Sequence, residues 1–248
     1  MKKWQAHSTN CMNNINSLVS VIMSCYNSEN TLKSSIESIL NQTYKNIEFL
    51  IINDASTDTT FEILKSYQVE NNKIKIFSNN HNIGLTKSLN LLIKNSSGEF
   101  IARQDADDIS YKNRREKQVF EMEKFNLDFS VTRAIRKDNG KLIPNLSYNL
   151  PSKFVVRFKN PFVHGTFMLR KKSIEKINLY DENFYFSQDY KLISDMFKNN
   201  FKYKKIRTIL YELNMKDNIS SNKKDEQKYY SDCVRNNLIP DPTFKNNL

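Results

Sequence analysis

Three aspartates, Asp105, Asp107 and Asp108, form the densest group of chemically capable residues in the sequence. They follow a short apolar run, so we expect alternate carboxylates at the end of one strand, where they repel each other unless a cation lies between them. Carboxylate oxygens suit Mg²⁺ or Mn²⁺, which proteins usually share with substrate phosphates. A metal here would neutralise a departing diphosphate. The motif alone fits equally well with acids that cap a helix beginning near Tyr111 and face solvent.

Two earlier apolar runs also end in polar residues. Residues 19–25 lead into Tyr26, and residues 47–52 lead into Asn53 and Asp54. In an open α/β sheet the ligand lies beyond the carboxyl ends of the strands, so these side chains should converge with the aspartates. A tyrosine can stack on a nucleobase, and a carboxylate can accept a hydrogen bond from a base imide or a ribose hydroxyl. The simpler alternatives are that Tyr26 packs at a strand end and that Asp54 caps the next helix.

The elements that would position these residues alternate in the first half of the chain. Short runs of apolar and β-branched residues predict buried parallel strands at 19–25, 47–52, 73–77 and 99–102. Between them, apolar residues at helical spacing predict helices at 29–42, 61–67 and 85–93. This alternation is typical of a parallel α/β sheet.

Beyond Asp108 the alternation weakens. We expect a charged helix near 113–124, an irregular region with strand-like pieces to about 150, a strand-like segment at 162–169, and short helices at 171–177 and 189–198. The predicted organisation is a polar lead, a single domain with two halves, and a polar basic tail: residues 1–17, 18–221 (18–110 and 111–221) and 222–248.

Composition and charge limit the class of protein. A chain of 248 residues suits one large domain, and its aromatic content of 12% argues against a disordered chain. The formal net charge of +11 suggests a polyanionic partner. Nucleic acid, an acidic membrane face and a phosphorylated small molecule all fit that charge.

The cysteines and the N-terminus bear on the compartment. Cys11, Cys25 and Cys233 are widely spaced, so they predict neither a metal site nor a disulfide framework, and they fit a reducing compartment. Residues 1–17 lack the apolar segment of a secretory signal, and no stretch approaches the roughly 18 apolar residues of a spanning helix. We therefore expect a cytoplasmic protein, either soluble or peripheral at the inner face of the cell membrane.

Eight motifs in a fixed order resemble those of family-2 glycosyltransferases with the GT-A fold. They lie at 19–27, 38–44, 51–59, 82–85, 98–108, 113–114, 164–168 and 188–189, and the resemblance covers about residues 18–221. It implies an α/β, GT-A-like single domain whose mostly parallel central sheet is flanked by helices, with a nucleotide-binding N-terminal half.

The resemblance also implies roles for individual residues on the donor side. Ser24 and Tyr26 would line the nucleobase site, and Asp54 would hydrogen-bond the uracil. Asp105 would lie near the ribose and the sugar. Asp107 would bind the metal, Mn²⁺ or Mg²⁺.

On the acceptor side, the resemblance makes Asp189 the general base that deprotonates the acceptor hydroxyl, which allows in-line attack with inversion. His164 would contact the donor sugar or the acceptor. The alternatives are that His164 is a core histidine and that Asp189 caps the helix it precedes. Gln188 stands where the family usually has Glu. Leu213 and Met215 stand where many relatives carry basic residues that help bind the diphosphate.

The function implied is transfer of a hexose or an N-acetylhexosamine from a UDP-sugar to a hydroxyl of a surface polysaccharide, a lipooligosaccharide or a lipid-linked oligosaccharide. The alternative is a degenerate relative that binds a nucleotide sugar without turnover. Nucleic acid is not expected as a partner, because the sequence shows an acidic cluster at 105–108 and no basic stripe with interleaved aromatics. A nucleotidyltransferase should carry a glycine-rich basic loop after the first strand, and residues 26–29 contain no glycine and no cation.

The positive charge would bring the protein to an anionic membrane face where lipid-linked acceptors reside. The lysines expected to make that contact are Lys202, Lys204, Lys205, Lys223 and Lys224. A solvated basic surface is the alternative for the same residues.

Overall fold

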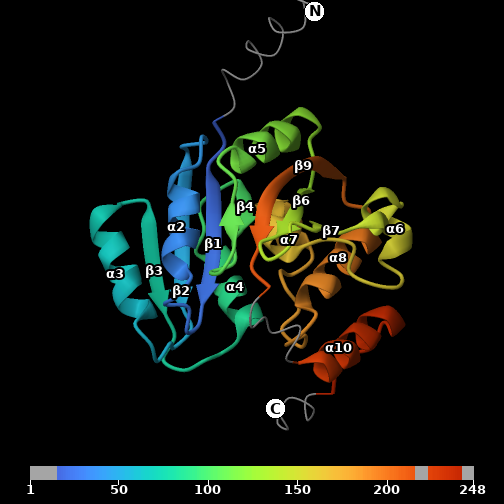
Figure 1. The fold of residues 1–248 in the computed structure, drawn as a ribbon. Helices are drawn as coiled ribbons and strands as arrows, with labels where there is room; N and C mark the ends of the chain where they lie inside the picture. Colours follow the sequence, from blue (N-terminus) through green and yellow to red (C-terminus); the bar gives the residue numbers. More distant parts are fainter. Residues whose placement is uncertain (1–15, 216–222, 242–248) are drawn as a thin grey trace, which may run out of the picture.

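The N-terminal half of the chain forms the parallel part of a central sheet (Figure 1). The structure is a computed structural model that describes residues 16–215 and 223–241. Four strands lie side by side in the order β3-β2-β1-β4: β1 (Val19–Cys25), β2 (Ile47–Asn53), β3 (Ile74–Ser78) and β4 (Phe100–Arg103). Every residue of β2 and β4 is buried, as expected for parallel strands that are covered on both faces.

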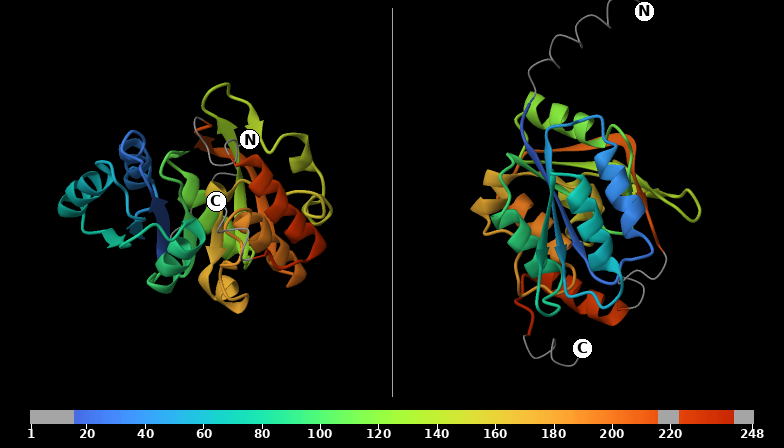
Figure 2. Two further views of the ribbon diagram at one scale, coloured as in Figure 1. Left: turned by 90° about the horizontal axis from the view of Figure 1, so that it is seen from below. Right: turned by 90° about the vertical axis from the view of Figure 1, so that its left-hand side faces the viewer.

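Helices cover both faces of this sheet (Figure 2). Leu32, Ile36 and Ile39 of α2 (Leu32–Leu40) pack with Val21 and Met23 on one face, where α3 (Thr60–Glu70) also lies. The opposite face packs against apolar residues of α4 (Leu85–Lys94) and α8 (Gln188–Lys198). Because side chains alternate along each strand, the strands contribute to two separate hydrophobic cores, one on each face of the sheet.

The second half of the chain extends the same sheet with mixed strand directions. The order continues β4-β8-β6-β9-β5, with β8 antiparallel to β4 and β6, and β9 parallel to β6. These strands are β5 (Ile109–Ser110), β6 (Phe129–Arg136), β7 (Leu142–Ile143), β8 (Met168–Arg170) and β9 (Tyr203–Leu213). The remaining helices are α5 (Arg114–Lys124), η1 (Leu146–Asn149), α6 (Ser152–Val155), η2 (His164–Thr166), α7 (Lys171–Lys176) and α10 (Lys224–Asn236).

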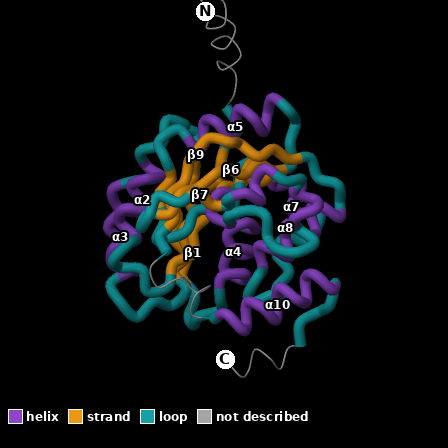
Figure 3. The backbone as a smooth tube through the Cα atoms, turned by 45° about the vertical axis from the view of Figure 1, so that its right-hand side comes forward, coloured by secondary structure: helices purple, strands orange, loops and turns teal. Residues whose placement is uncertain are grey.

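Two segments of the second half differ from the sequence-based expectation. The strand-like segment at 162–169 is interrupted by the 3₁₀ turn η2, where Thr166 Oγ1 and the Thr166 amide both donate to the Val163 carbonyl. Only Met168–Arg170 pairs as a strand. The polar C-terminal tail contains α10, which lies against α8 (Figure 3) and buries Tyr230, Cys233 and Val234. The α/β class is confirmed, and the proposed domain boundaries stay a prediction.

Two consecutive arginines at the start of α5 are fully buried, and they differ in whether their guanidinium groups have hydrogen-bond partners among the described residues. Arg114 donates to Gln118 Oε1 at 2.9 Å, to Ser110 Oγ at 2.9 Å and to the Arg103 carbonyl at 3.0 Å. None of the side-chain nitrogens of Arg115 has a hydrogen-bond partner among the described residues. Burial, and then the charge of Arg114, hold the pKa of Arg115 well below its usual range. A buried cation without a partner destabilises the folded state.

We therefore expect Arg115→Leu to stabilise the protein, because it replaces an unpaired buried cation with an apolar side chain. The midpoint of thermal unfolding should rise by about 2–4 °C, which corresponds to about 1 kcal/mol for a domain of this size. The matched variant Arg114→Leu should lower the midpoint, since it strands several buried acceptors. Calorimetry of both variants tests this, and a lower midpoint for Arg115→Leu would contradict it.

Candidate active site

The polar residues at the ends of β1, β2 and β4 lie at one edge of the sheet. The Asp54 amide donates to the Cys25 carbonyl at 2.8 Å, and the Gln104 amide donates to the Ile22 carbonyl at 3.1 Å. Ser24 is half-buried, whereas the Tyr26 side chain is 50% exposed. Tyr26 is thus open to a ligand at this edge, as a stacking residue must be.

Asp54 is only 2% exposed and its carboxylate is already engaged. Oδ1 accepts from Asn79 Nδ2 at 2.7 Å and from the Ile83 amide at 3.0 Å, and Oδ2 accepts from the Gly84 amide at 2.9 Å. Gly84 has a φ of +88°, and a Cβ there would lie 2.6 Å from Tyr185 Cε2. Asp54 therefore fixes the connection between β3 and α4, and its contact with a uracil stays a prediction.

The loop after β4 concentrates negative charge. Asp105 pairs with the buried Arg103 guanidinium, and Asp107 is half-buried beside it. Burial and the nearby Asp105 carboxylate raise the pKa of Asp107 to about 6. Burial, followed by Asp105 and Asp107, also raises the pKa of Asp108 well above its usual range. Asp108 Oδ1 accepts from the Asn214 amide at 2.8 Å, so the end of β9 is tied to this loop.

The donor set of this loop fits a divalent cation shared with a ligand. Among residues 16–215 and 223–241, no three His, Cys, Asp or Glu side chains are arranged to hold a metal by themselves. Asp105 and Asp107 would supply one or two carboxylates, and Mg²⁺ or Mn²⁺ commonly completes its coordination with phosphate oxygens and water. The raised pKa of Asp107 reflects crowding of like charges, which a cation would relieve.

Asp189 lies in the first turn of α8, which begins after Ser187 in the left-handed conformation. Its Oδ2 accepts from Asn160 Nδ2 at 2.6 Å, and its Oδ1 accepts from the Tyr190 amide at 2.8 Å. Burial raises its pKa above the usual range, the two hydrogen bonds oppose that shift, and Asp105 adds to it. The arrangement gives a fixed carboxylate with raised proton affinity, which is what a general base requires.

His164 lies in η2 and joins the same region. Its Nε2 lies 2.7 Å from the Tyr180 hydroxyl, and burial followed by the charge of Arg103 holds its pKa well below the usual range. Burial raises the pKa of Tyr180, Arg103 lowers it, and Asp189 and Asp105 raise it. His164 is therefore held neutral and is hydrogen-bonded to Tyr180, and it is the Tyr180 hydroxyl that lies within electrostatic reach of Asp105 and Asp189.

Several residues of this site were given no role in the sequence analysis: Arg103, Asn160, Tyr180 and Tyr211. Gly165 shows how closely they pack, because a Cβ there would lie 2.8 Å from Asp105 Oδ2 and would also overlap the Tyr211 hydroxyl. Arg103 lies inside the motif at 98–108, and its position just before three aspartates could have indicated a role in balancing their charge. Asn160 and Tyr180 carry no such signal, since loop contacts alone bring them to the site.

The family model described as glycosyl transferase family 2 matches residues 20–178, which include the three strand ends, the aspartate loop and η2. The chain belongs to this family. It is 38% identical over 169 residues to EpsE of Bacillus subtilis (strain 168), covering 65% of this chain and 59% of EpsE. It thus spans less than two thirds of that relative's length.

Two further relatives come from Escherichia coli. The O-antigen biosynthesis glycosyltransferase WbnJ is 38% identical over 183 residues, covering 71% of this chain and 70% of WbnJ. WfgD, named as a UDP-Glc:α-D-GlcNAc-diphosphoundecaprenol β-1,3-glucosyltransferase, is 42% identical over 113 residues, covering 45% of this chain and 44% of WfgD.

Solved structures share the fold. Residues 1–349 of TarS from S. aureus, solved in complex with UDP-GlcNAc, superpose with a TM-score of 0.72 at 19% identity, covering 92% of this chain and 69% of the TarS 1–349 chain. The mannosyltransferase PcManGT of Pyrobaculum calidifontis, in complex with GDP-Man and Mn²⁺, gives a TM-score of 0.70 at 15% identity, covering 92% of this chain and 67% of PcManGT. The GT-A fold predicted from the sequence is confirmed.

The geometry around Asp189 predicts how its titration responds to substitution. Asn160→Ala removes a hydrogen bond that favours the ionised carboxylate, so the pKa of Asp189 should rise further above its usual value. Carboxyl ¹³C NMR titration of aspartate-labelled protein measures this shift, with Asp189→Asn assigning the resonance. The exposed Asn139→Ala serves as the control and should leave the Asp189 midpoint unchanged. An unaltered midpoint in Asn160→Ala would show that the amide does not control this carboxyl.

Proposed function

We propose that the chain transfers a hexose or an N-acetylhexosamine from a UDP-sugar to an acceptor hydroxyl, with metal assistance and inversion. The observation that carries this proposal is the convergence of a crowded carboxylate loop, Asp105–Asp108, with a fixed carboxylate of raised pKa at Asp189. Membership of glycosyl transferase family 2 and the shared fold of TarS, solved with UDP-GlcNAc, support the UDP-sugar.

Each part of this site has a defined task in the proposed reaction. Tyr26 stacks on the base, and Ser24 lines the same edge. Asp107 would hold Mn²⁺ or Mg²⁺, which when bound neutralises charge on the departing diphosphate, and Asp105 would lie near the ribose and the sugar. Asp189 takes the proton of the acceptor hydroxyl, while Asn160 holds the Asp189 carboxylate in place. His164 and Tyr180, joined by their hydrogen bond, orient groups between the donor sugar and the acceptor.

The acceptor proposed is a saccharide of a surface polysaccharide or lipooligosaccharide pathway, or a lipid-linked oligosaccharide at the inner face of the cell membrane. WbnJ is named for O-antigen biosynthesis, and the name of WfgD specifies a diphosphoundecaprenol-linked sugar. No helix within the described parts of the chain is long and apolar enough to span a bilayer. A peripheral position would bring the protein to such an acceptor through electrostatic attraction to anionic lipid.

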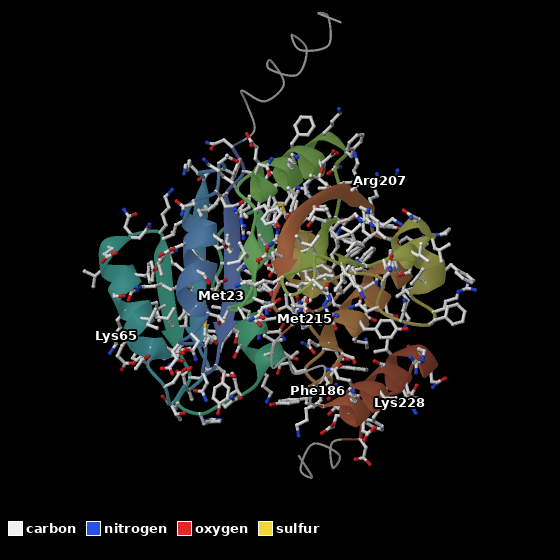
Figure 4. The ribbon with its side chains drawn as sticks, in the orientation of Figure 1. Met23, Lys65, Phe186, Arg207, Met215 and Lys228 are labelled. Carbon is white, nitrogen blue, oxygen red and sulfur yellow. The ribbon has the colours of Figure 1, made fainter. Side chains whose placement is uncertain are left out.

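A donor-binding protein without turnover is the second candidate, because Leu213 and Met215 replace basic residues that would help hold the diphosphate. Leu213 ends β9, and Met215 lies near the middle of the molecule in Figure 4. Lys216, which could substitute for them, lies outside the described residues. This candidate predicts nucleotide-sugar binding with no sugar transfer.

A nucleotide-release assay separates these candidates. Purified protein is incubated with UDP-glucose, UDP-galactose, UDP-N-acetylglucosamine, UDP-N-acetylgalactosamine or GDP-mannose, with Mn²⁺ or with EDTA. We expect slow release from one UDP-sugar that EDTA abolishes. Calorimetric binding of a UDP-sugar without release, even when acceptor saccharides are added, would favour the non-catalytic candidate. Absence of binding to every donor would contradict both.

Two substitutions divide donor binding from chemistry. Asp107→Ala should abolish the Mn²⁺-dependent part of UDP binding, with Asp138→Ala as a surface control.

Asp189→Asn should leave UDP binding intact and reduce transfer about 10²- to 10⁴-fold, the range typical of a lost general base. Asp195→Asn, on the same helix, is the control for Asp189. Full transfer by Asp189→Asn would show that the base lies elsewhere.

A further inference from the structure

One side of the molecule, around η1 and α6, combines exposed apolar side chains with unopposed positive charge. Leu146, Leu150, Phe154 and Phe158 recur at intervals of four residues, and their exposed fractions are 79%, 48%, 53% and 59%. The Phe154 and Phe158 rings contact each other edge-on at 5.3 Å between centroids. Large apolar side chains gathered in this way mark an interaction surface rather than scattered exposure.

The charge of this surface has one sign. Residues 139–174 contain no Asp or Glu, and they include Lys153, Arg157 and Lys159, which are all exposed. Neither Arg157 nor Lys159 forms an ion pair within the described ranges 16–215 and 223–241. Asp232, which α10 brings to this side, is already paired with Arg235, whose Nη1 donates to the Phe158 carbonyl.

A basic cavity adjoins the same segment. It measures about 390 Å³ and is lined by Tyr148, Asn149, Tyr203, Lys204, Lys205 and Arg207. Lys205 Nζ and Arg133 Cζ each lie 5.2 Å from the centre of the Tyr148 ring. Arg133 Nε is buried without a hydrogen-bond partner among the described residues. Lys204 is paired with Glu121, and Lys205 donates to two backbone carbonyls. Among the residues that line this cavity, Arg207 is therefore the cation available to a phosphate oxygen.

The apolar and basic surface also leads toward the proposed catalytic base. Lys159 immediately precedes Asn160, which donates to Asp189. A second cavity of about 450 Å³ is lined by Leu146, Lys159, Asn160, Phe162 and residues 143–145 and 147. One wall of this cavity therefore belongs to the exposed surface, and another includes the residue that orients Asp189.

We propose that the surface formed by Leu146, Leu150, Phe154 and Phe158 with Lys153, Arg157 and Lys159 docks on an anionic phospholipid bilayer. The phenylalanines and leucines enter the interface between headgroups and acyl chains, and the cations lie among the lipid phosphates. This surface does not use the lysines that the sequence suggested for membrane contact. Three of those lysines are already engaged: Lys204 pairs with Glu121, Lys223 pairs with Glu226, and Lys205 donates to two backbone carbonyls. Its use in reaching a lipid-linked acceptor rests on the proposed function, but the docking itself does not.

Vesicle cosedimentation tests the docking without any nucleotide sugar. The full chain is mixed with vesicles of about one third phosphatidylglycerol in phosphatidylcholine, at about 100 mM salt, and with vesicles of phosphatidylcholine alone. We expect binding to the anionic vesicles that falls about tenfold or more in the variant Phe154→Ser with Arg157→Glu and Phe158→Ser. The matched control is Lys65→Glu with Val69→Ser on α3, and Figure 4 places Lys65 far from Arg207. The control variant should bind like the unsubstituted chain.

Three results would overturn the docking surface. The first is no binding to anionic vesicles, and the second is an equal loss of vesicle binding in both variants. The third is a concentration-dependent dimer that only the η1–α6 substitutions dissociate, because this face would then be a contact between copies of the chain. UDP binding measured on the same proteins keeps the two proposals apart. If the η1–α6 variant keeps UDP binding and loses vesicle binding, the substitutions have affected the docking surface alone. If the unsubstituted chain binds vesicles but no sugar donor, the result contradicts only the proposed function.

Discussion

Repulsion among carboxylates after β4 is the constraint on which the site depends. Asp105, Asp107 and Asp108 cannot all carry full charge in so small and sheltered a space without a compensating cation, and the raised pKa values of Asp107 and Asp108 express this. Arg103 compensates Asp105 from within the protein. The remaining imbalance faces the edge of the sheet where Tyr26 is exposed, which is where a metal and a diphosphate would balance it.

A buried polar network holds these charges in place. Arg114 donates to the carbonyls of Arg103 and Phe167 and to Ser110, so one guanidinium joins the end of β4, β5 and the entry to β8. Gln104 reinforces it by accepting from Ser110 Oγ at 2.6 Å and donating to the Asp108 carbonyl at 2.9 Å. Satisfied buried networks of this kind fix one backbone arrangement. The loop is thus shaped by donors beneath it, independently of any ligand.

The sequence predicts the donor side of this molecule better than the acceptor side, for a physical reason. The parallel strands β1, β2 and β4 are buried on both faces, so each appears as a short apolar run, and the polar residue that ends it is easy to place. Strand β9 is only partly buried and its pairing with β6 shifts register, so its residues, Tyr203–Leu213, show no simple alternation. Helix α10 buries just Tyr230, Cys233 and Val234, a stripe too narrow to stand out in a polar segment.

Contacts between loops could not be predicted at all. The pairing of Asn160 with Asp189 spans 29 residues, and the backbone donors to Asp54 lie 29 and 30 residues further along the chain. Residues such as Asn160 and Ile83 carry no periodic signal, because an isolated polar residue or backbone amide in a loop looks the same in the sequence whether it faces solvent or another part of the chain. The role proposed for Asp189 came from the family resemblance, and the structure adds the amide that orients it.

The close approach of Gly84 to Tyr185 joins two segments that are far apart in the sequence. Asp54 accepts a hydrogen bond from the Gly84 amide at the edge where the base would bind. Tyr185 lies two residues before Ser187, the residue that precedes α8. A side chain at Gly84 would therefore have to displace either Tyr185, just ahead of α8, or the backbone whose amide Asp54 accepts, so a single position couples the connection between β3 and α4 to the start of α8.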